Sequence, residues 1–186
     1  GFGAHIQVVN FDANLSYETV PVSSNQPFVS KIREHRGIRN VQVFATKAGI
    51  IKTDENIQGV VLKGIGSDYD WSFFRSNMVE GETLSVSDTA RSNDVVISKK
   101  VADMLGFMPG DSFSMFFVQD PPRMRKFTVL GIYETSLEEF DKTYLFCDIN
   151  HIRSLNGWSD DQISGFEIYI NDFDQLDYMT DVIRDS

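Results

Sequence analysis

The side chains that could perform nucleophilic or metal chemistry are few, and they lie far apart along the chain. The histidines are His5, His35 and His151, and their spacing matches none of the common metal-binding motifs, such as HExxH. Cys147 is the single cysteine, so an intrachain disulfide is excluded. It lies in the apolar run "TYLFCDI". We interpret Cys147 as a small buried hydrophobe. The pattern predicts no metal site and no catalytic cysteine.

Carboxylates are the remaining candidates for acid–base chemistry. Glu80 with Glu82, or Glu134 with Glu138 and Glu139, could form the pair that a hydrolase needs. Such a pair requires a shared cleft, whereas charged side chains near turns are usually solvated, and the nucleophile elbow G-x-S-x-G is absent. We therefore expect no pocket in which polar side chains converge with shifted pKa values, and we expect the chain not to be an enzyme.

Cofactor and nucleic-acid binding are also disfavoured. Glycines in "KGIGSD" match neither GxGxxG nor GxxxxGK[ST], so no nucleotide cofactor is predicted. The formal net charge of −10 argues against nucleic acid, because neutralising phosphates requires a surplus of lysine and arginine.

One basic cluster stands out on this acidic chain. The segment "FFVQDPPRMRKF" predicts a hairpin with its turn at 119–125, stiffened by Pro121 and Pro122. Arg123 and Met124 follow, and methionine is an adaptable apolar contact residue. We predict that these four residues bind a partner, because a rigid loop loses less entropy on binding. The alternative is an ordinary exposed turn.

The elements that must position this hairpin can be read from hydrophobic periodicity. A strand at 5–11, a helix ending near Gly37 and a strand pair at 39–51 and 57–66 open the chain. A short helix is expected at 71–74, and another carries Ile97, Val101, Met104 and Leu105 before Gly106 ends it. The remaining predictions are strands at 111–118, 126–135, 142–149 and 164–171, and helices at 150–157 and after Asp172 or Asp174, either of which could be its N-cap.

These elements predict an α+β fold in two parts. The first is discontinuous, 1–66 plus 164–186, and forms a small sheet covered by two helices. The second, 67–163, is inserted into it and is mostly antiparallel β. No run approaches the roughly 20 apolar residues of a membrane span. Both chain ends look cut from a longer protein.

Several segments resemble the extracytoplasmic domain of FtsX/MacB-type ABC transporter permeases, and most closely the lipoprotein-releasing transmembrane subunits LolC and LolE. They are "GFGAHIQVVNFD", "IQGVVLKGIGSDYD", "DVVISKKVADMLGFMPGDSFSMF" and "FTVLGIYETSLEEFDKTYLFCDINHIRSL". In the third, Ser98 stands where the family usually has glycine, and Ser136 replaces a frequent glycine in the fourth. Together the segments span most of the chain.

The resemblance implies a MacB-like periplasmic core domain, with a porter subdomain and an inserted sabre subdomain. It implies an inner-membrane protein with one membrane helix before this region and three after it, a separate ATPase subunit and a second permease subunit. The domain would couple ATP-driven motion of those helices to substrate handling. In the lipoprotein-releasing branch, Pro121, Pro122, Arg123 and Met124 would contact a periplasmic lipoprotein carrier.

Alternatives remain open at this point. A MacB-like efflux or FtsX-type permease would transmit motion to an outer-membrane duct or a cell-wall hydrolase. A periplasmic hydrolase using paired carboxylates is the weaker alternative. Trp71, Phe73 and Phe74 either meet an acyl chain or pack in the core, and core packing is favoured.

Overall fold

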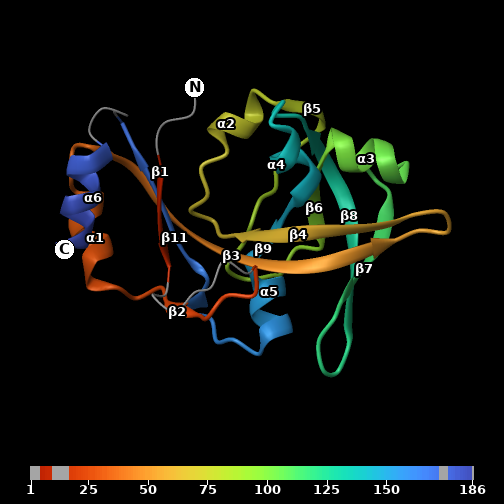
Figure 1. Cartoon of the computed structure of the whole chain (residues 1–186), viewed down its shortest axis with the longest axis horizontal. Helices are drawn as coiled ribbons and strands as arrows, with labels where there is room; N and C mark the ends of the chain where they lie inside the picture. Colours follow the sequence, from red (N-terminus) through yellow and green to blue (C-terminus); the bar gives the residue numbers. More distant parts are fainter. Residues whose placement is uncertain (1–4, 10–16, 172–175, 186) are drawn as a thin grey trace.

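The computed structural model describes residues 5–9, 17–171 and 176–185, and most of its strands belong to one large sheet (Figure 1). Its strand order is β1-β11-β3-β4-β9-β6-β8-β5, with β7 beside both β3 and β8. The bounds are β1 His5–Val9, β3 Ile38–Lys52, β4 Ile57–Ile65, β5 Met78–Gly81, β6 Asp94–Ser98, β7 Ser112–Phe117, β8 Arg123–Tyr133, β9 Tyr144–Asp148 and β11 Gly165–Ile170. A separate pair joins β2 Val22–Ser23 to β10 Gln162–Ile163.

Six short helices flank the strands in the described part of the chain. They are α1 Pro27–Arg33, α2 Ser72–Arg75, α3 Lys99–Leu105, α4 Glu138–Thr143, α5 Ile149–Asn156 and α6 Leu176–Arg184. The predicted α+β class with a mostly antiparallel sheet is confirmed. Two neighbouring pairs, β4 with β9 and β6 with β8, are parallel.

Strand β7 closes part of the sheet into a ring. It pairs with β8 along its length and with β3 at Ile50 and Ile51, so the path β3-β4-β9-β6-β8-β7 returns to β3. Gly49 allows this approach, because a Cβ there would lie 2.4 Å from the Met115 side chain of β7. The ring combines strands from both predicted subdomains, whose boundary stays a prediction.

The first half of β3 leaves this ring and joins β11 and β1, where α1 and α6 cover one face (Figure 1). Side chains alternate between the faces of a strand. Phe166 and Ile168 pack in the core with Ile32 of α1 and Met179 of α6. On the opposite face Gln7, Glu167 and Gln42 stand in register across the three strands.

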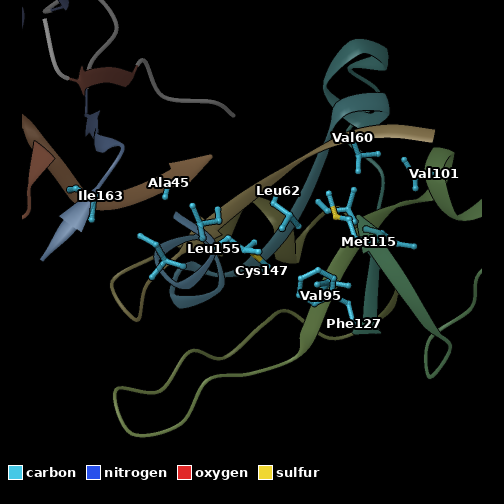
Figure 2. Packing of buried hydrophobic residues seen from close by; sticks show 14 of the residues in the cluster. Ala45, Val60, Leu62, Val95, Val101, Met115, Phe127, Cys147, Leu155 and Ile163 are labelled. Carbon is cyan, nitrogen blue, oxygen red and sulfur yellow. The ribbon is translucent and has the colours of Figure 1, made fainter. Parts of the chain in front are cut away.

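One hydrophobic cluster runs from the helix-covered end into the ring. Figure 2 shows Ile163 and Ala45 at one end of it, Leu62, Cys147 and Leu155 in the middle, and Met115, Val101 and Phe127 further along. Cys147 is fully buried, which confirms its interpretation as a core residue, and burial raises the pKa of its thiol. None of the helices in the described part of the chain has the length and apolar composition of a membrane span.

The helix predicted to include Ile97 begins later. Ile97 belongs to β6, and α3 starts at Lys99 with Ser98 as its N-cap. Met104, predicted on the apolar face, is 40% exposed. Gly106 ends the helix with a φ of 73°, as predicted. Likewise 142–143, predicted as strand, are the end of α4. Asp172 and Asp174, the predicted N-cap candidates of the last helix, lie outside the described residues.

Replacement of Ser98 by alanine should lower the free energy of unfolding by about 1–2 kcal/mol. The buried Ser98 hydroxyl donates to the Asp141 carbonyl at 2.5 Å and accepts from the Val101 N–H at 3.0 Å. Alanine would leave both groups without this partner. Urea denaturation measures the change, and the same substitution at exposed Ser85 serves as the control. Equal effects at the two serines would contradict the capping role.

Candidate functional site

The four residues predicted to bind a partner lie at the tip of the β7–β8 hairpin, which projects from the ring (Figure 1). Pro121 and Pro122 are exposed in the turn. Arg123 and Met124 are not turn residues, because they begin β8 and pair with Phe117 and Phe116. The turn is therefore shorter than the predicted 119–125.

The inner face of the hairpin is attached to the end of α5. The Gln119 side chain donates to the Leu155 carbonyl at 3.0 Å. Arg125 donates to the Ser154 hydroxyl, also at 3.0 Å, and burial, followed by the neighbouring Arg123 and Arg91, lowers the pKa of Arg125. These contacts hold the strands above the tip in place.

The outer face is apolar and open. Phe116 is 40% exposed and its cross-strand neighbour Met124 is 51% exposed. Val118, the residue that follows β7, is 90% exposed. With exposed Lys126 beside them, these side chains offer a compact apolar contact with a basic margin.

A second candidate site is a cavity of about 450 Å³ on the polar face of β1, β11 and β3. One end is polar, and its lining includes His5, Arg39, Lys63, Asp70 and Glu167. The other end is aromatic, with Phe73 and Phe74 from α2, Phe140 from α4 and Tyr144. The cavity thus has a charged end and an apolar end.

The charged end contains a buried ion pair. Lys63 Nζ lies 2.7 Å from Glu167 Oε2, and the two side chains are 11% and 2% exposed. His5 Nε2 approaches the same oxygen at 4.0 Å. Lys63 Nζ also lies over the Phe44 ring, 5.4 Å from its centre, in a cation–π contact. Glu167 Oε1 has no hydrogen-bond partner among the described residues.

We expected no pocket in which polar side chains with shifted pKa values converge, and this expectation is wrong. Hydrogen bonds from Ser72 hold the pKa of Asp70 below its usual value. Burial raises the pKa values of Tyr69 and Tyr169, which also line the cavity. These shifts follow from burial and from a local turn. The signal in the sequence was the polar alternation of Asn40 and Gln42 in β3 and of Glu167 and Tyr169 in β11, which predicts a polar sheet face but not what covers it.

The predicted carboxylate pairs lie elsewhere. Glu80 and Glu82 are exposed on and beside β5. Glu134 and Glu138 line an open surface groove, where Lys100 donates to Glu138 at 2.9 Å and lowers its pKa. Glu139 is exposed.

The histidines occupy separate places. Nε2 of the buried His151 lies 2.7 Å from the Ser92 carbonyl, and burial lowers the pKa of His151 to about 4. Within residues 5–9, 17–171 and 176–185 no three His, Cys, Asp or Glu side chains are grouped as a metal ion would need. Trp71 and Phe74 are 7% and 5% exposed, which confirms core packing for both.

Comparison with known proteins identifies the fold. No protein-family model and no curated protein matches the chain. The extracellular domain of the ABC-type transporter YknZ from Gram-positive bacteria is similar, with a TM-score of 0.61 and 18% identity, over 94% of this chain and 88% of that one. The periplasmic region of MacB from Actinobacillus actinomycetemcomitans is similar with a TM-score of 0.59 and 13% identity, over 97% and 81%. The chain therefore has the fold of the extracytoplasmic domains of ABC-type transporter permeases.

Proposed function

We propose that the chain is the extracytoplasmic domain of an ABC-type transporter permease and lies on the outer side of the cytoplasmic membrane. The supporting observation is the fold, which it shares with YknZ over 94% of its length. Membrane helices would join it near β1 and α6. A separate ATPase subunit would drive the motion of these helices. Their motion would move this domain and the corresponding domain of a second permease subunit together. The domain itself would be no enzyme.

The full-length gene product tests this proposal. It should partition into the membrane fraction and co-purify with an ATPase subunit whose ATP turnover depends on it. A freely soluble product, or one that hydrolyses a periplasmic substrate through Glu134 and Glu138, would contradict the proposal.

The substrate handled is, in our proposal, a lipoprotein passed to a periplasmic carrier through the hairpin tip. The tip carries exposed Pro121, Pro122 and Met124, and the strands behind it are attached to α5. A preorganised loop of this kind binds with a small entropic cost. The MacB-like fold equally supports the alternative, in which the domain transmits motion to an outer-membrane duct or a cell-wall hydrolase.

Replacement of residues 121–124 by Gly-Ser-Gly-Ser should weaken binding of the lipoprotein carrier by at least about tenfold, because it removes apolar contacts and preorganisation. The melting temperature should stay within a few degrees, since these residues lie at the tip. Calorimetric titration with the purified carrier measures the effect. The control changes exposed Asp54 and Glu55 in the β3–β4 turn to serine. Unchanged carrier binding would remove the hairpin proposal, and binding of a duct component instead would favour the alternative.

A further inference from the structure

The polar-to-aromatic cavity between the β1–β11–β3 sheet face and α2 and α4 has no role in the proposed function. Its lining combines charged side chains with aromatic rings. Charged groups of β1, β3, β4 and β11 form one end, and the rings of Phe73, Phe74 and Phe140 form the other. A molecule complementary to both ends is amphipathic and small enough for about 450 Å³.

The sign of its polar group follows from which hydrogen-bonding groups are already used. Asp70 Oδ1 accepts from the Ser72 N–H at 2.9 Å and from the Ser72 hydroxyl at 2.6 Å. Glu167 Oε2 accepts from Lys63 at 2.7 Å, so its charge is compensated. One oxygen of each carboxylate is therefore engaged. Within the described residues Glu167 Oε1 has no hydrogen-bond partner, and the nearest cation to Asp70 Oδ2 is Arg39, at 4.0 Å.

Among the basic side chains that line the cavity, Arg39 offers the most hydrogen-bond donors without a partner in the described part of the chain. Its guanidinium carries five N–H donors. The nearest carboxylate oxygen, Asp70 Oδ2, lies at 4.0 Å, which is beyond a hydrogen bond, and no hydrogen bond from this side chain exists within the described part of the chain. The guanidinium lies 5.3 Å from the centre of the Tyr169 ring, which orients it, and the side chain is 42% exposed. An oriented guanidinium with free donors binds carboxylate and phosphate in a bidentate manner.

The apolar end is preformed. Phe74 packs edge-on to Phe73 at 5.3 Å and is stacked with Phe140 at 6.1 Å between ring centres. Phe140 lies 5.0 Å from Tyr144. Because these rings already pack on the aromatic core behind them, an apolar chain laid against them would require little rearrangement.

We infer that this cavity binds a small amphipathic anion, with its carboxylate or phosphate at Arg39 and its apolar arm against Phe73, Phe74 and Phe140. The Lys63 ammonium neutralises the negative charge of Glu167, which would otherwise repel the anion. This site is independent of the hairpin, so the two proposals can fail separately.

Calorimetric titration of the 186-residue chain tests the inference with three decyl probes. We expect saturable binding of decanoate, of decyl phosphate, or of both, and the preference distinguishes a carboxylate site from a phosphate site. Decyltrimethylammonium, which has the same chain and the opposite charge, should bind at least about tenfold more weakly. Trp71 packs against Tyr69 and Phe74 of the cavity wall, so its fluorescence should change on binding in a Trp158→Phe background.

The decisive variant is Arg39→Gln, which should weaken binding of the anionic probe by at least about tenfold. Arg36→Gln is the matched control, because Arg36 is an exposed arginine on the same segment and does not line the cavity. Both positions are exposed, so the variants should keep the wild-type melting temperature. Absence of saturable binding by either anion, equal binding of the cationic probe, or equal affinity of the Arg39→Gln and Arg36→Gln variants would overturn the inference.

Discussion

Replacement of Phe146 by alanine should lower the free energy of unfolding by about 3–5 kcal/mol. Phe146 is fully buried in β9, between β4 and β6. Its ring centre lies 4.8 Å from that of Phe74, and four other rings surround it within 6.2 Å, namely those of Trp71, Tyr133, Tyr69 and Phe140. Alanine would leave a cavity inside this aromatic cluster. The surrounding aromatic side chains are fixed by the strands and helices that carry them, so they can fill the cavity only in part.

Urea denaturation of matched variants measures this effect. Phe146→Leu keeps most of the apolar volume and should cost less than half as much as Phe146→Ala. Phe116→Ala is the control for loss of an aromatic ring, because Phe116 is 40% exposed on the hairpin. A similar loss of stability for Phe116→Ala and Phe146→Ala would show that the aromatic cluster does not hold the fold as described.

The second large effect is expected at the buried ion pair. Replacement of Glu167 by alanine should cost about 3–5 kcal/mol, because it leaves the Lys63 ammonium uncompensated in a site where its side chain is only 11% exposed. The cost comes from the stranded charge rather than from the strength of the pair. Removing both charges should therefore restore most of the lost stability.

The double variant Lys63→Met, Glu167→Leu tests this reasoning. Its stability, measured by urea denaturation, should lie much nearer to wild type than that of Glu167→Ala. The exposed pair Lys99–Asp103 is the control, and Lys99→Ala should change stability little because solvent screens this contact. A double variant as unstable as Glu167→Ala would show instead that side-chain packing decides the effect.

Local structure was predictable because local rules decide it. The turn between Lys52 and Ile57, the helix end at Gly106 and the end of α5 at Gly157 each depend on a few neighbouring residues. The start of α3 was misplaced because Ile97 continues the apolar period of the helix, while the capping serine stands one residue later. The N-cap serine, Ser98, therefore marks the start of the helix better than the hydrophobic periodicity does.

Long-range contacts could not be predicted in this way. Lys63 and Glu167 are 104 residues apart in sequence, and no local rule relates them. The pairing of β7 with β3 involves only two residue pairs, yet it closes the ring. The hairpin tip could be found because its prolines and basic residues are contiguous, whereas the cavity is assembled from five strands and two helices. Its residues become a site only after folding.

The length of β3 has a geometrical consequence. At about 3.3 Å per residue, its fifteen residues span roughly 50 Å, from the sheet under α1 and α6 to the far turn at Lys52. Phe44, and again Ile50 and Ile51, have neighbouring strands on both sides, so bending the strand there would break pairings on two flanks together. If β3 is tilted by a few degrees at the end covered by α1 and α6, its opposite end near Lys52 would therefore be displaced by several ångströms.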